Sequence, residues 1–271
     1  MATINEKMTA VADAIREYAH LDNRLTLDDM AQAPALIHEQ AYQQGEMDGR
    51  SAGEEAGFAA GKEQGEKDYW NAFWDMFQQN GSRVTYTYAF AEAFTDELFK
   101  PKYDLRPTNA NQMFMGSLIT NLKQLLEDAG VELDTSNAKY ITQAFTSSKT
   151  THLPVIDCTS STLISATFMA ESLVYIEKVI VKETHTFPNA FGYASKLTEV
   201  RFEGAIANDI NFQWSPLSVE SMKSIISCLS TSVSGKTITF NDACWAALEA
   251  SGVSPTGGTW KNYVTDLGWN A

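Results

Sequence analysis

Three consecutive segments of the chain resemble one another: ITQAFTSSKTTHLPVIDCTSSTL (141–163), ISATFMAESLVYIEKVIVKETHTF (164–187) and PNAFGYASKLTEVRFEGAIANDI (188–210). A phenylalanine recurs at intervals of 23, 23 and 21 residues: Phe145, Phe168, Phe191 and Phe212. Apolar residues in extended-looking runs follow each of the first three. This period is typical of leucine-rich repeats, whose units must stack because one strand and one short return segment cannot bury their own apolar face. We therefore predict a short, irregular leucine-rich-repeat-like solenoid within residues 141–271.

A short solenoid needs covered ends. At the C-terminal side, SVESMKSIISCL (218–229) and DACWAALEASG (242–252) have the periodicity of helices, and KTITF (236–240) has that of a strand. We expect these three elements to form a helical C-terminal cap. The amphipathic stretch at 117–134 is interpreted as part of an irregular first repeat.

The segment 45–65 has the most unusual composition in the chain, because every fourth residue is glycine: Gly45, Gly49, Gly53, Gly57, Gly61 and Gly65. Each glycine costs a helix interior about 1 kcal/mol relative to alanine, so an isolated helix of this composition is unfavourable. Close contact between helix backbones along the bare strip would offset that cost. The sequence favours an oligomeric helical stalk, with a trimer as the first expectation, over a flexible glycine-rich linker.

The remaining parts of the chain complete a predicted α+β architecture of four regions. Residues 1–41 contain two amphipathic helical stretches, which form either a hairpin or a short coiled coil with other copies. Residues 42–80 are the predicted stalk, which ends in five aromatic residues between Tyr69 and Phe77 that either anchor the next domain or bind carbohydrate. Residues 81–140 are a transition region with a strand near Val84, and 141–271 are the repeat domain.

Composition and charge exclude several classes of function. The 34 acidic and 20 basic residues give a formal net charge of -14, which disfavours binding to nucleic acid or to anionic lipid. No window reaches the length of a membrane-spanning helix, and the acidic N-terminus lacks the apolar stretch of a signal peptide. The three cysteines, which contain no C-x-x-C pair, are expected to be small buried thiols: Cys158, Cys228 and Cys244.

Catalytic and metal-binding patterns are also missing from the sequence. The four histidines are far apart and include no pair spaced for one helix face, although His152 and His185 could approach each other across repeats. Nucleophile-elbow, phosphate-loop and dinucleotide-binding motifs are missing too. We therefore expect no enzyme activity, no cofactor and no metal.

Several segments resemble structural proteins from the tails of phages and prophages of Gram-positive gut bacteria. The resemblance lies in VADAIREYAHLDNRLTLDDMAQA (11–33), in the glycine-spaced run, and in YWNAFWDMFQQNG (69–81) with the following YTYAF. AFGYASKLTEVRFEGAI (190–206) and SGKTITF (234–240) resemble the phage versions of leucine-rich-repeat surface antigens. The patterns are structural rather than catalytic, and the repeats here are fewer and less regular than in the surface antigens.

This resemblance implies a virion protein of the tail tip, baseplate or fibre, assembled in the cytoplasm of the host bacterium. Its expected partners are other copies of the chain, other tail or baseplate proteins, and a receptor on the host cell surface. The alternatives are a bacterial leucine-rich-repeat surface adhesin and a head-attached auxiliary phage protein. If the repeat domain binds a ligand, the candidate contacts are three tryptophans, Trp214, Trp260 and Trp269, although the composition of protein interiors favours a place in the core or the cap for each.

Overall fold

The computed structural model describes residues 13, 61, 62, 64, 65, 67, 68, 84–92 and 94–271. The chain divides into two compact units, residues 1–78 and 79–271. In the first unit, the described residues are helical, and they include Gly61 and Gly65 of the glycine-spaced segment. The two predicted N-terminal helices, the other four glycines of the predicted stalk and the aromatic cluster at 69–77 lie outside the described residues.

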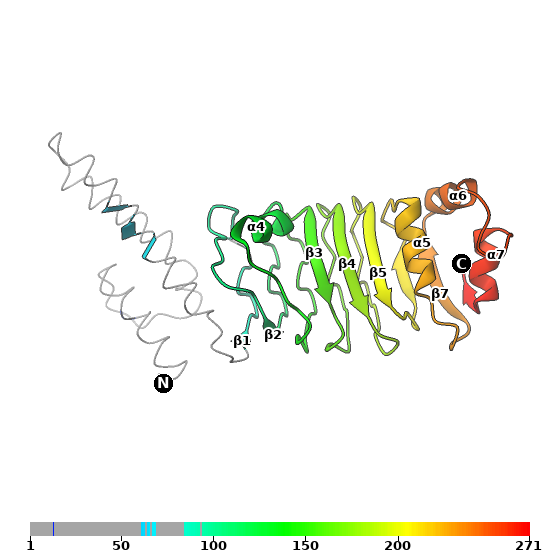
Figure 1. Cartoon of the computed structure of the whole chain (residues 1–271), viewed down its shortest axis with the longest axis horizontal. Coiled ribbons are helices and arrows are strands. Elements are labelled where there is room, and N and C mark those ends of the chain that lie inside the picture. The colour runs from blue at the N-terminus through cyan, green and yellow to red at the C-terminus, as the bar shows by residue number, and fades with distance from the viewer. Residues whose placement is uncertain (1–12, 14–60, 63, 66, 69–83, 93) are drawn as a thin grey trace. The chain divides into compact units, whose positions relative to one another are not determined.

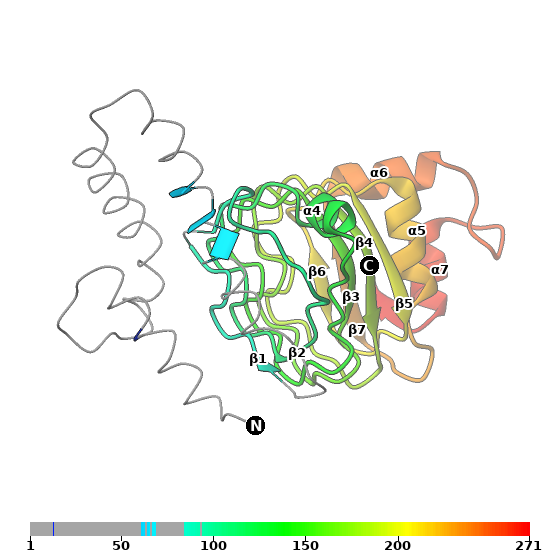
Figure 2. The same cartoon turned by 60° about the vertical axis from the view of Figure 1, so that its left-hand side comes forward.

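The second unit consists of parallel chain segments that lie side by side (Figures 1 and 2). In Figure 2 these segments follow one behind another from cyan to red along the chain. The elements, in chain order, are β1 (Val84–Thr85), β2 (Pro107–Asn109), α4 (Leu122–Ala129), β3 (His152–Asp157), β4 (Tyr175–Val181), β5 (Glu199–Gly204), β6 (Ile210–Phe212), α5 (Val219–Ser227), β7 (Lys236–Phe240), α6 (Asp242–Ala250), α7 (Trp260–Asp266) and β8 (Trp269–Asn270).

All the strand pairs among the described residues are parallel. They form the pair β1-β2 and two three-stranded sheets in the orders β3-β4-β5 and β6-β7-β8. In the first sheet, Ile176 of β4 lies between Leu153 of β3 and Val200 of β5. These three side chains are buried, so one face of the sheet packs against the core.

A column of stacked phenylalanine rings runs through the core of this unit. Successive ring centroids are 5.1, 5.5, 6.1, 5.0, 4.5 and 5.9 Å apart. The rings belong to Phe90, Phe114, Phe145, Phe168, Phe191, Phe212 and Phe240, all of which are buried. The phenylalanines that recur in the sequence therefore touch one another, and the column extends in both directions beyond the three similar segments.

The tight corner before five of these rings has left-handed backbone, with a positive φ at the second residue before the phenylalanine. Those residues are Tyr88, Gln112, Gln143, Ala166 and Asn189. Non-glycine residues adopt this conformation uncommonly. Its recurrence at one place indicates that the stacking of neighbouring segments holds each corner in the same shape.

Nevertheless, the predicted leucine-rich-repeat solenoid is wrong. The described residues of the second unit contain four helices, one two-stranded sheet and two three-stranded parallel sheets, in which no leucine-rich solenoid is identified. The row of strands β3-β4-β5 is not continued by the neighbouring segments, where α4 and α5 lie instead (Figure 1). The stacked core column is made of phenylalanine rather than leucine. The 23-residue spacing thus reflects aromatic stacking over a few segments and not the repeat that its length suggested.

Helix α5 closes one edge of the sheet β3-β4-β5 through serine hydroxyls. The backbone N–H groups of Val200 and Phe202 in β5 donate to Ser221 Oγ at 2.9 Å and Ser224 Oγ at 3.0 Å. An unpaired edge strand would leave these amides without acceptors. The serines allow a helix to lie where another strand would otherwise pair.

Candidate functional site

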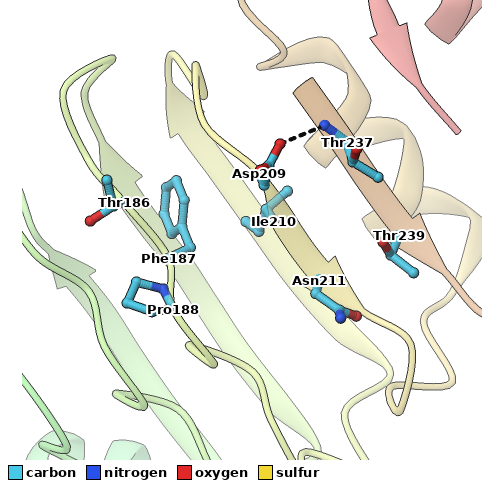
Figure 3. A pocket seen from close by; sticks show the side chains of 8 residues that line it. All are labelled: Thr186, Phe187, Pro188, Asp209, Ile210, Asn211, Thr237 and Thr239. Atoms are coloured by element: carbon cyan, nitrogen blue, oxygen red, sulfur yellow. Dashed lines mark hydrogen bonds between the residues drawn. The ribbon is translucent and has the colours of Figure 1, made fainter. Parts of the chain in front are cut away.

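The best candidate site among the described residues is a surface groove of about 420 Å³ on the side of the second unit that carries β6 and β7 (Figure 3). This volume lies within the range of small-molecule sites, roughly 300–1,000 Å³. Three neighbouring chain segments line it: Thr186, Phe187 and Pro188; Asp209, Ile210 and Asn211; Thr237 and Thr239.

The groove follows from a mismatch in length between two stacked segments. Phe191 lies four positions after Phe187, but Phe212 lies only two positions after Ile210. The rings of Phe191 and Phe212 are in contact at 4.5 Å, so the extra residues before Phe191 cannot stay in register with β6. The two segments diverge on the side away from the ring column, and the surface between them is hollowed.

Backbone hydrogen bonding changes at the same place. The preceding segment is tied to this one by Ile164 N–H to Thr186 O and Ala166 N–H to Pro188 O, both at 3.0 Å. In the described part of the chain, no backbone hydrogen bond joins Phe187 or Asn189 to residues 209–211. The groove therefore lies at a break in the ladder of hydrogen bonds between segments.

The groove has an apolar floor and a polar rim. Phe187 and Ile210 are buried, whereas the side chains of Asp209 and Asn211 are exposed. Asp209 Oδ1 accepts from the backbone N–H of Thr237 at 2.7 Å, which fixes the carboxylate at the rim (Figure 3). Asn211 Oδ1 accepts from Gln213 N–H at 2.8 Å, which fixes the amide in the same way.

Each rim side chain has a polar atom that is free to form a hydrogen bond with a ligand. Within the described chain, Asp209 Oδ2 and Asn211 Nδ2 have no hydrogen-bonding partner, and neither do the hydroxyls of Thr186 and Thr239. The groove thus offers a fixed acceptor, a fixed donor and hydroxyls that can serve as either. These groups can form hydrogen bonds with a molecule that enters the groove.

The three tryptophans proposed as ligand contacts are not brought together. Trp214 is 57% exposed, but Trp260 and Trp269 are 7% and 1% exposed. The indole N–H groups of the buried pair donate to Gly252 O at 3.1 Å and Ser230 O at 2.9 Å. Of the three, Trp214 alone is placed to meet a ligand, while the other two belong to the core of the C-terminal end.

The glycines proposed to mediate oligomerisation are described at only two positions. Gly61 is exposed and helical, and Gly65 is helical and half-buried. A Cβ added at Gly61 would meet no other atom of the described chain within 4 Å. A side chain could therefore be accommodated there within one chain. Gly45, Gly49, Gly53 and Gly57 lie outside the described residues.

The two histidines that could approach across repeats serve separate structural roles. His152 packs against the ring of Tyr175 at 5.5 Å, whereas His185 is buried with hydrogen bonds at both ring nitrogens. Lys182 N–H donates to His185 Nδ1 at 3.2 Å, and His185 Nε2–H donates to Ser161 O at 2.8 Å. Burial lowers the pKa of His185, so its neutral form is favoured.

The cysteines are free thiols, and Cys158 and Cys244 are buried as predicted, while Cys228 is half-buried. Burial raises the pKa of all three thiols, which favours the unreactive protonated form.

In the part of the chain that the structure covers, no cluster of three His, Cys, Asp or Glu side chains is arranged to hold a metal ion. Of the helices described there, none has the length and hydropathy that crossing a bilayer would require.

The groove residues were not identified from the sequence, although the sequence contains a pattern that relates three of them. Thr186, Asp209 and Thr237 each directly precede a buried apolar residue of a neighbouring segment: Phe187, Ile210 and Ile238. Aligning the segments on these apolar residues would have placed the three polar side chains in one row. The alignment on phenylalanines alone missed the row because the segments differ in length before the ring.

Comparison with known proteins gives no relative for this chain: no family model, no curated protein and no solved structure matches it.

Proposed function

We propose that this chain is a non-enzymatic structural protein of a bacteriophage tail tip, baseplate or fibre, and that its C-terminal unit contacts a receptor on the host cell. The N-terminal region would attach it to other tail or baseplate proteins and hold several copies together. Assembly would take place in the cytoplasm of the host bacterium. The sequence resemblances described above support the location in the tail.

The observation that carries the binding role is a core built on a continuous column of phenylalanine rings, with exposed aromatic side chains on the surface around it. The stacked phenylalanines form a continuous buried column from Phe90 to Phe240. Outside this column, the most exposed aromatic side chains among the described residues are Tyr88, Tyr140, Tyr193 and Trp214. Tyrosine and tryptophan are enriched at recognition surfaces because they supply contact area at low cost in side-chain entropy. A packed core that presents such side chains on its surface is suited to docking.

Purified particles provide the test of this proposal. Particles from an induced host are separated on a density gradient into complete virions, free tails and tailless heads, and the chain is quantified in each fraction by mass spectrometry. We expect a fixed copy number in virions and free tails and none in tailless heads. Absence from virions and tails, or recovery with tailless heads, would overturn the assignment.

A further inference from the structure

We propose that the groove between residues 186–188, 209–211 and 237–239 binds the pyranose ring of an uncharged saccharide. This inference rests on the receptor-contacting part of the proposed function and specifies the class of ligand. It follows from the chemistry of the lining, from the charge at the rim and from the fixed positions of the polar atoms.

The lining combines the two kinds of surface that a sugar ring presents. A pyranose has an apolar face of C–H groups and a rim of hydroxyls, each of which both donates and accepts hydrogen bonds. In the groove, Phe187, Pro188 and Ile210 supply apolar surface. Threonine hydroxyls and the ends of Asp209 and Asn211 surround it (Figure 3). A purely apolar ligand would leave this polar rim without partners.

The charge of the groove disfavours an anionic ligand. Asp209 is the one ionisable residue in the lining of the groove, and the chain as a whole carries a net charge of -14. Anionic sugars would be repelled by the carboxylate. The lining provides no aromatic cage for a cation. Hydroxyl groups, in contrast, can donate to Asp209 Oδ2 and accept from Asn211 Nδ2.

The polar atoms are held in place before a ligand arrives. The backbone amides of Thr237 and Gln213 hold the inner oxygens of Asp209 and Asn211. Thr239 lies on β7, which pairs with β6 on one side and β8 on the other. Such preorganisation reduces the entropy lost on binding and allows specific recognition in a shallow site.

The test uses the full chain and four neutral sugars: D-glucose, D-galactose, D-mannose and N-acetyl-D-glucosamine. Saturation-transfer NMR is recorded with each sugar, and D-glucuronate serves as the charged probe. We expect transfer to at least one neutral sugar and weaker transfer to glucuronate. No transfer to any of the four would overturn the proposal, as would transfer to glucuronate at least as strong as to the neutral sugars.

Two conservative variants locate the binding. Asp209→Asn keeps the inner oxygen that accepts from Thr237 but replaces the outer acceptor, and Thr239→Val removes a hydroxyl while keeping the shape of the side chain. Each is expected to weaken binding about tenfold, the effect of one lost hydrogen bond to a ligand. Thr184→Ala, at an exposed threonine outside the lining, should bind like the wild type.

A third variant distinguishes sugar binding in the groove from sugar binding at the exposed Trp214. If Trp214→Ala abolishes binding while Asp209→Asn and Thr239→Val leave it unchanged, the sugar does not bind in the groove and the inference fails. The result is independent of where the chain resides. A chain found in tails without sugar binding overturns the saccharide site alone, and a sugar-binding chain that is absent from virions overturns the tail assignment alone.

Discussion

The imidazole of His185 connects the stability of the second unit to pH. Its Nδ1 accepts from Lys182 N–H, so protonation at Nδ1 would remove an acceptor in a buried site. Because the pKa is lowered in the folded chain, the unfolded chain binds the proton more readily. The contribution of His185 to stability is complete above the unfolded pKa of about 6.5 and is lost as pH falls below it towards the folded pKa.

We therefore expect the free energy of unfolding, measured by urea titration, to be nearly constant between about pH 7 and 8 and to fall below about pH 6.5. The variant His185→Gln should be less stable at pH 7.5 and should lose most of this dependence between about pH 5 and 6.5. An unchanged slope in the variant would show that other groups cause the loss.

A second residue-scale prediction concerns the ring column. Phe168 is fully buried, with Phe145 at 6.1 Å on one side and Phe191 at 5.0 Å on the other. Phe168→Ala should lower the free energy of unfolding by about 3–5 kcal/mol, because it removes apolar contacts and leaves a cavity between two rings. Tyr193→Ala, at a side chain that is 69% exposed, should change it by less than about 0.5 kcal/mol. Similar losses in the two variants would refute the role of the column.

At the scale of elements, serine hydroxyls of α5 accept hydrogen bonds from the edge strand β5. Ser221 Oγ accepts from Val200 N–H and donates to Thr198 O at 3.2 Å, and both Ser221 and Val200 are buried. Ser221→Ala would leave the amide without an acceptor, at an expected cost of about 1–3 kcal/mol.

Hydrogen exchange measures this effect locally. The amide of Val200 should exchange faster in Ser221→Ala, with smaller changes in β3. Ser227→Ala, at an exposed serine of the same helix whose hydroxyl donates to Ser224 O, is the control. Equal protection of Val200 in both variants would mean that the serine hydroxyl is not the acceptor that protects this edge.

The sequence predicted several of these elements well. The helix expected at 218–229 is α5 (Val219–Ser227), the strand at 236–240 is β7, and the helix at 242–252 contains α6 (Asp242–Ala250). Each is a local element with its own signals, such as Asn241 accepting from Cys244 N–H at the start of α6. Periodicity and capping suffice for such elements because both act within a few residues.

The larger arrangement could not be predicted in the same way. Helix α4 lies between Phe114 and Phe145 and lengthens their interval to 31 residues. Because this interval differs from 23, the sequence does not indicate that the two rings stack at 5.5 Å. Between Phe191 and Phe212 the interval shortens to 21 because the corner before the ring loses two residues. That loss also produces the groove. Neither the groove nor the fold class was predicted correctly, because both depend on these changes in the interval between phenylalanines.

At the scale of the whole molecule, the proposed oligomer gives a further prediction. Light scattering of the purified full chain should report three times the 29.9 kDa mass of one chain. Gly57→Leu, in the glycine-spaced segment, should reduce the mass to that of a monomer because a large side chain would separate the helix backbones. Thr184→Ala, at an exposed threonine outside that segment, is the control. A monomeric wild type would contradict the trimer.

We propose that the chain is part of a phage tail and faces the host cell. The most direct measurement is electron microscopy of intact virions labelled with gold-tagged antibody against residues 84–271. Gold at the tip, baseplate or fibres of the tail is the expected result. Gold on the head, or virions without label beside a labelled bacterial surface, would contradict the claim.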